Sequence, residues 1–171
     1  MIRVLEDDRD EDSSIDLTKE VDAVFESGGW LEQVLDFDHR QEQAEMAGSV
    51  CRSLVRGEHL LFEAGTGVGK SLAYLVPSIL FAKTRKRPCV VATNTISLQE
   101  QLLEKDIPAL RQLIKEIPHL SELADFKCAL LVGRANYLCS TRLRKTMAGQ
   151  SELFEGAQRA ELQRIAQWAD T

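Results

Sequence analysis

The residues of this chain best suited to chemistry lie in one glycine-rich stretch that ends in a lysine and a serine. Glycines in such a loop allow positive φ, so that backbone N–H groups can converge on an anion. A lysine ammonium can then reach the β- and γ-phosphates, and a serine hydroxyl can ligate the Mg²⁺ that bridges them. The stretch predicts a phosphate-binding loop for ATP with Mg²⁺, and the alternative is a glycine-rich turn without a ligand. Its residues are Ala64, Gly65, Thr66, Gly67, Val68, Gly69, Lys70 and Ser71, with Lys70 as the catalytic cation and Ser71 as the metal ligand.

A second polar stretch, rich in hydroxyls and amides, follows an apolar run that ends at Thr93. Hydroxyl and amide groups can bind the phosphates of single-stranded DNA without reading its sequence. The alternative is that these residues only cap the helix that follows them. The candidate DNA contacts are Thr93, Thr95, Gln99 and Gln101.

Three short apolar runs predict the strands that would position these groups. They cover residues 60–62, 88–93 and 126–132, and each is bounded by polar residues, glycine or proline. Apolar positions at helical spacing separate the runs, which favours alternating strands and helices. The predicted fold class is therefore α/β, with a parallel sheet flanked by helices. We expect the phosphate-binding loop to join the first strand to a helix that begins near Lys70.

The charge of the chain is concentrated at its start. Residues 1–20 hold eight acidic and three basic side chains, a net charge of −5, which leaves −1 of the total −6 for the other 151 residues. We expect an acidic leader, then short helices from Asp16 onward, where Asp16 is placed as an N-cap. The leader lacks the basic start of a signal peptide, and the longest apolar run is too short to span a bilayer. These features predict a cytoplasmic protein.

The four cysteines form no pair at metal-binding spacing. Cys51 falls on an apolar helix face, and Cys89 and Cys128 fall within the predicted strands. A free thiol at such positions behaves as a small apolar group, so we expect these three in the core. Cys139 has different neighbours, because it ends the sequence Gly-Arg-Ala-Asn-Tyr-Leu-Cys.

Taken together, four motifs make the chain resemble the N-terminal part of DinG-type helicases, the bacterial relatives of XPD in helicase superfamily 2. The motifs lie within residues 37–139: Arg40-x-x-Gln43 followed by Met46-Ala47, the loop from Glu63 to Ser71, the stretch from Thr95 to Pro108, and the stretch from Gly133 to Cys139. The resemblance implies a RecA-like domain. It also implies that Arg40 and Gln43 belong to the nucleotide site, with Gln43 reading adenine because its amide both donates and accepts hydrogen bonds. Without the loop, Gln43 would be interpreted as an ordinary helix-surface residue.

In the family, the motif that ends at Cys139 supplies the first of four cysteines that hold a [4Fe-4S] cluster. The resemblance therefore makes Cys139 a candidate cluster ligand, and the alternative is a lone cysteine at a helix start. It divides the chain into an acidic leader with short helices (1–36), the first part of the helicase ATP-binding domain (37–135) and a truncated start of the iron–sulfur domain (136–171).

The sequence also departs from the family pattern. Ala64 replaces the first glycine of the general loop pattern, as is common in helicase ATPases, and Gln41 stands where proline is usual. No Asp-Glu-x-His sequence occurs in the chain. We therefore interpret the chain as the ATP-binding start of a DNA helicase that moves on single-stranded DNA, without turnover of its own. The alternatives are a non-catalytic nucleotide- or DNA-binding module and another enzyme with the same loop, such as a small kinase.

Overall fold

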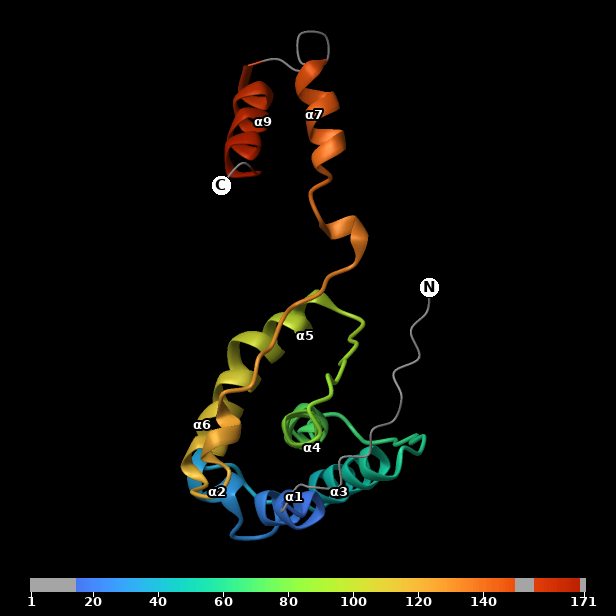
Figure 1. Ribbon diagram of the computed structural model, residues 1–171, viewed down its shortest axis with the longest axis vertical. Coiled ribbons are helices and arrows are strands. Elements are labelled where there is room, and N and C mark those ends of the chain that lie inside the picture. The colour runs from blue at the N-terminus through green and yellow to red at the C-terminus, as the bar shows by residue number, and fades with distance from the viewer. Residues whose placement is uncertain (1–14, 150–155, 170–171) are drawn as a thin grey trace. The chain divides into compact units, whose positions relative to one another are not determined.

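The computed structural model describes residues 15–149 and 156–169, and the chain divides into two units between Cys128 and Ala129. Within these described stretches the chain forms helices and irregular segments (Figure 1). None of the described helices combines the length and the apolar character that crossing a bilayer requires.

The first unit begins with three helices whose ends follow local sequence signals. Helix α1 spans Leu17–Phe25, and the Asp16 carboxylate accepts hydrogen bonds from two N–H groups of its first turn, at 3.1 and 3.3 Å. Helix α2 spans Trp30–Leu35 and α3 spans Gln41–Arg56. Gly57 ends α3 with a φ of 68°, the left-handed conformation that glycine adopts without strain. The N-cap at Asp16 and the helix stop at Gly57 confirm the sequence prediction.

Helix α4, Lys70–Thr84, begins at the end of the glycine-rich loop and is the most buried helix of this unit. It packs against α1 and α3 on one side and against the segment between α5 and α6 on another, and Figure 1 shows it end-on between them. Its apolar positions therefore face protein in several directions. Pro77 lies inside the helix and is fully buried.

A π-helical turn, η1, joins the next two helices into one run. Helix α5 spans Ile96–Gln101, η1 spans Leu102–Asp106 and α6 spans Ile107–Glu116. The N–H of Ile107 donates to the Leu102 carbonyl, five residues back. Pro108 comes next and has no N–H, so it makes no α-helical hydrogen bond to the carbonyl four residues back. The helical run is one residue wider at η1 than in a regular α-helical turn, and α6 continues beyond it.

The end of the first unit folds back on α4 and α6. A 3₁₀ turn, η2, spans Ser121–Ala124 and packs against α6. The Arg111 guanidinium lies 4.7 Å from the centre of the Phe126 ring and donates to the Phe126 carbonyl at 2.8 Å. The Lys83 ammonium donates to the Asp125 carbonyl at 3.0 Å. These contacts bring only the first part of the segment after η2 onto the core.

The core of the first unit is made by helix faces and by the turn after α6. Its largest fully buried side chains are Val21, Val24, Cys51, Val76, Pro77, Leu80, Leu110, Leu113, Ile114, Ile117 and Leu120. Burial of this kind of apolar surface is the main term that stabilises a fold.

The second unit contains a 3₁₀ turn, η3, at Arg134–Asn136, helix α7 at Ser140–Ala148 and helix α9 at Gly156–Ala169. Helices α7 and α9 pack against each other. None of the described helical residues of this unit is buried.

The prediction of an α/β fold with a parallel sheet is wrong for the described structure. Residues 60–62, 88–93 and 126–132, the three expected strands, are irregular, and no strand occurs in residues 15–149 or 156–169. Their apolar side chains are largely exposed: Leu61 is 99% exposed, Val90 is 91% exposed and Leu131 is 84% exposed. Phe62 is partly buried and Phe126 is buried, so a single residue of each of those runs contributes to the core.

The physical reason is that an apolar run is compatible with a strand but does not identify the strand with which it would pair. A strand exists only where a neighbouring strand lies about 4.8 Å away and exchanges backbone hydrogen bonds with it. In this structure the first unit closes its core with helices, and the three runs do not hydrogen-bond to one another. Their spacing in the sequence could not reveal that.

Leu110 and Leu61 offer a direct test of this fold. Replacing the fully buried Leu110 by alanine should lower the free energy of unfolding by about 2–5 kcal/mol, because a cavity is left in the core. Leu61→Ala should change it by less than about 0.5 kcal/mol, because that side chain is exposed. Urea denaturation of the whole chain measures both. Equal losses would contradict the exposed position of Leu61 and support a buried strand there.

Candidate functional site

Two glycines of the glycine-rich loop adopt the left-handed backbone conformation. Gly67 and Gly69 have φ values of 82° and 85°, in the region that side chains rarely adopt, whereas Gly65 does not. All three glycines could adopt positive φ, and the structure shows it at two of them. The loop leads directly into α4, whose first residue is Lys70. The positive end of that helix dipole therefore lies at the loop.

The lysine of the loop folds back over it. Its ammonium donates to the Ala64 carbonyl at 3.1 Å and to the Gly65 carbonyl at 2.5 Å. An ammonium has three N–H donors, so these two bonds leave one for another acceptor. Ser71 is half-buried in the first turn of α4. The Lys70 ammonium and the Ser71 hydroxyl thus come from adjacent positions at the start of one helix.

Two side chains from the start of α3 hold the same loop. The Arg40 guanidinium donates to the Gly67 carbonyl, and the Gln43 amide donates to the Gly69 carbonyl at 2.9 Å. Gln43 is 5% exposed and is the one buried polar side chain among the described residues. The two residues that the family resemblance assigned to the nucleotide site therefore do lie against the glycine-rich loop.

The contact between Gln43 and Gly69 leaves no room for a side chain on the loop. A Cβ atom built on Gly69 would overlap the amide nitrogen of Gln43. The φ of Gly69 independently disfavours any residue with a Cβ. Glycine at this position is thus required twice, once by the backbone and once by the neighbour.

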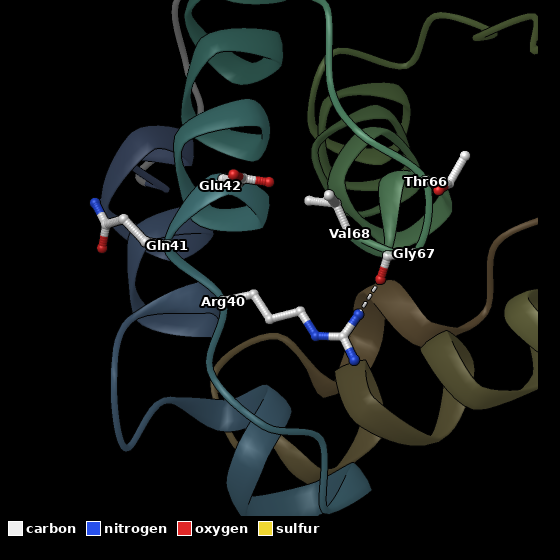
Figure 2. A pocket seen from close by; sticks show the side chains of 6 residues that line it. All are labelled: Arg40, Gln41, Glu42, Thr66, Gly67 and Val68. Carbon is white, nitrogen blue, oxygen red and sulfur yellow. Dashed lines mark hydrogen bonds between the residues drawn. The ribbon is translucent and has the colours of Figure 1, made fainter.

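An open pocket of about 390 Å³ lies between the start of α3 and the loop (Figure 2). Figure 2 shows Arg40 and Glu42 extending toward the loop, whereas Gln41 points away from it. The pocket combines a cation, a carboxylate and an apolar side chain, as sites for small polar ligands do. It is lined by Arg40, Gln41, Glu42, Thr66, Gly67 and Val68.

Gln41 and Glu42 were missed by sequence reasoning. The signal that could have found them is their position, because they lie between Arg40 and Gln43 in the sequence and share the first turn of α3. Residues at the start of a helix point in several directions, however, and the sequence does not say which of them face the loop.

The expected DNA contacts lie around the start of α5. The Thr95 hydroxyl accepts from the N–H of Leu98 at 3.3 Å, and the Thr93 hydroxyl donates to the Thr95 carbonyl at 3.3 Å. The Gln101 amide donates to the Asp106 carboxylate at 3.3 Å. Thr95 thus has the helix-capping role that was the alternative to DNA contact. The contact of Thr93, Thr95, Gln99 and Gln101 with DNA stays a prediction.

The cysteines lie in different surroundings. Cys51 is buried in the core, as expected, but Cys89 is half-buried and Cys128 is exposed, so the expectation of three core thiols is confirmed for Cys51 alone. Burial raises the pKa of both the Cys51 and the Cys89 thiols. Cys139 is exposed at the residue before α7. Within the described stretches, no group of three or more histidine, cysteine or acidic residues could hold a metal ion.

Comparison with known proteins gives the family context of this site. The chain is 41% identical over 145 residues to the ATP-dependent helicase DinG of Mycobacterium tuberculosis, a match that covers 77% of this chain and 21% of that protein. It is 36% identical over 155 residues to the ATP-dependent DNA helicase YoaA of Haemophilus influenzae, covering 90% of this chain and 22% of the relative. The ATP-dependent DNA helicase DinG of Salmonella typhimurium is 40% identical over 114 residues, 66% of this chain and 15% of the relative.

The chain spans about a fifth of the length of these relatives, or less. No family model matches it, and no solved structure gives a significant match. The matched regions nevertheless cover most of the chain at 36–41% identity, and the relatives are all named as ATP-dependent helicases. The resemblance that the four motifs indicated is thereby confirmed: over most of its length the chain is similar to one part of DinG-type ATP-dependent helicases.

Proposed function

We propose that this chain binds ATP with Mg²⁺ through the loop from Ala64 to Ser71, as the nucleotide-binding part of a DNA helicase. The observation that carries the proposal is the convergence on one loop of two left-handed glycines, the start of α4 and the Lys70 ammonium. Backbone N–H groups and the helix dipole favour an anion there, and Lys70 adds a full positive charge. The names of the relatives as ATP-dependent helicases support the choice of ATP.

The donors of the loop fit a triphosphate with its metal. Lys70 can keep both carbonyl contacts and still donate its third N–H to a phosphate oxygen. Ser71, one residue further on, would hold the Mg²⁺ through its hydroxyl. When bound, Mg²⁺ neutralises charge between the β- and γ-phosphates.

Arg40 and Gln43 act in this proposal as positioning residues for the loop. Each donates to a loop carbonyl, so the carbonyls are held on the side of α3 and the loop N–H groups are left for phosphate. The reading of adenine by Gln43 stays a prediction, and the amide would have to do it from a buried position.

The proposed activity of the full helicase is movement along single-stranded DNA, coupled to hydrolysis of Mg·ATP. Hydrolysis needs a carboxylate to hold the metal and a group to orient water. The sequence has no Asp-Glu-x-His motif to supply them. We therefore infer that the chain binds ATP but does not turn it over by itself. We also propose that Thr93, Thr95, Gln99 and Gln101 contact the DNA backbone. The remaining alternative is a nucleotide- or DNA-binding module without catalysis.

The [4Fe-4S] cluster that the family resemblance implies does not fit the described residues. A cluster of this kind is held by four thiolates. Cys139 is exposed, but Cys51 is buried in α3, and the described residues contain no group of three or more histidine, cysteine or acidic side chains that could hold a metal ion. Cys139 as one ligand stays a proposal, and no step of the proposed function depends on it.

The first test of nucleotide binding is the substitution Lys70→Ala. It should weaken binding of a non-hydrolysable ATP analogue with Mg²⁺ by roughly ten- to a hundredfold. This loss corresponds to the contribution of about 1.5–3 kcal/mol that a hydrogen bond to a charged group makes to the binding free energy. Isothermal titration calorimetry measures the affinity. Lys115→Ala, an equal change of charge at an exposed position on α6, serves as the control. Equal affinity in the wild type and Lys70→Ala would overturn the proposal.

A second test concerns turnover. Phosphate release from Mg·ATP in the presence of single-stranded DNA should stay at the level of the Lys70→Ala variant, because the acidic motif is absent. A phosphate-release assay on the purified chain measures this. DNA-stimulated release above that level would mean that another carboxylate of the chain holds the metal.

A third test separates backbone strain from the contact with Gln43. Gly57→Ala should cost about 1–2 kcal/mol of unfolding free energy, because its φ is 68° while the space around it is open. Gly69→Ala should cost roughly 1–3 kcal/mol more, since the added methyl also overlaps the Gln43 amide. Urea denaturation compares the two variants. Equal costs would show that Gln43 does not lie against Gly69.

A further inference from the structure

Glu42 is the one residue of the pocket with a carboxylate, and the family resemblance gives it no role. It lies between Arg40 and Gln43 in the first turn of α3, and its side chain extends to the side that faces the loop (Figure 2). The pocket that it lines adjoins the proposed phosphate site, because Thr66, Gly67 and Val68 form its other wall. The inference that follows rests on the proposed binding of ATP.

The side chains of Arg40 and Gln43, which flank Glu42 in the sequence, already donate hydrogen bonds to the loop. The Arg40 guanidinium donates to the Gly67 carbonyl, and the Gln43 amide donates to the Gly69 carbonyl from a position that is 95% buried. Glu42 is exposed in the pocket and has no hydrogen bond to the loop among those of the described residues. Its carboxylate is therefore the acceptor that an incoming group meets there.

A carboxylate selects among the atoms at the edge of a base. It accepts hydrogen bonds and cannot donate them, so ring nitrogens with lone pairs repel it. Adenine carries one exocyclic donor, its 6-amino group, and its ring nitrogens at the edges are acceptors. Guanine presents its donors, N1–H and the 2-amino group, in a different arrangement, so the comparison includes the β,γ-imido analogue of GTP as well as a ligand without the 6-amino group.

We propose that Glu42 accepts a hydrogen bond from the 6-amino group of adenine and is a specificity-determining residue of the nucleotide site. Val68 supplies an apolar surface in the same pocket against which a base can lie. Arg40 and Gln43 donate to carbonyls of the loop, and Glu42 adds an acceptor for the base. The plain alternative is that Glu42 only stabilises the start of α3 through the helix dipole.

The experiment removes the amino group from the ligand and the carboxylate from the protein. Calorimetry with Mg²⁺ compares the β,γ-imido analogue of ATP with the same analogue of purine riboside triphosphate, which lacks the 6-amino group. In the wild type, the amino group should raise the affinity about tenfold. This factor is at the lower end of the range for a hydrogen bond to a charged acceptor, because the pocket is open to solvent. In Glu42→Ala the two ligands should differ by less than about twofold, and Glu42→Gln, whose amide oxygen still accepts, should keep about threefold.

Glu45→Ala is the matched control. Glu45 lies one turn further along α3, carries the same charge and is not among the residues that line the pocket. It accepts a hydrogen bond from Gln41 at 3.0 Å. This variant should keep the full tenfold preference for the amino group.

Three results would overturn the proposal for Glu42. An amino-group preference of equal size in the wild type and Glu42→Ala, with both affinities unchanged, would place the contact elsewhere. Equal weakening of both ligands by Glu42→Ala would indicate the helix-stabilising role alone. Tighter binding of the GTP analogue than of the ATP analogue, lost in Glu42→Ala, would make the pocket a guanine site. Failure of the ATP proposal looks different, because then the wild type binds neither purine ligand or binds them as Lys70→Ala does.

Discussion

The hydrogen bond from the buried Gln43 amide to the Gly69 carbonyl is the contact on which the candidate site depends. It joins the start of α3 to the last residue before α4, two helices that also pack along their lengths. A buried amide left without a partner costs about 1–3 kcal/mol, so the loop and the side chain stabilise each other. Because Gly69 has no Cβ, the amide can lie against the backbone itself. The loop is thereby placed by packing between helices as well as by its own glycines.

Features that depend on a few neighbouring residues could be predicted from the sequence. The cap at Asp16 and the stop at Gly57 each need only one turn of chain and a residue type, and both occur as expected. The conformation of the glycine-rich loop has the same local character, because the spacing of Gly67, Gly69 and Lys70 determines which groups are adjacent, while its binding of phosphate stays a prediction. The placement of Arg40 and Gln43 against it came from the family resemblance and not from spacing.

Features that depend on distant partners could not be predicted. The runs that contain Leu61, Val90 and Leu131 are apolar, but pairing into a sheet requires neighbours that a run of residue types does not identify. The pocket was missed for a related reason, since Glu42 faces the loop only because α3 lies beside α4. Thr95 shows the intermediate case, in which a hydroxyl suited to binding DNA caps its own helix.

The π-helical turn between α5 and α6 has a consequence for how this helical run tolerates changes of length. In a regular α-helix, deleting one residue rotates everything beyond it by about 100°, which moves apolar side chains away from the core. Leu102–Asp106 already holds one residue more than an α-helical turn, with the Ile107 N–H bonded five residues back. A single deletion there would convert the wide turn into a regular one and leave the buried face of α6 with its partners. The turn thus marks the one place in the α5–α6 run where a residue can be lost without reorienting the helix that follows.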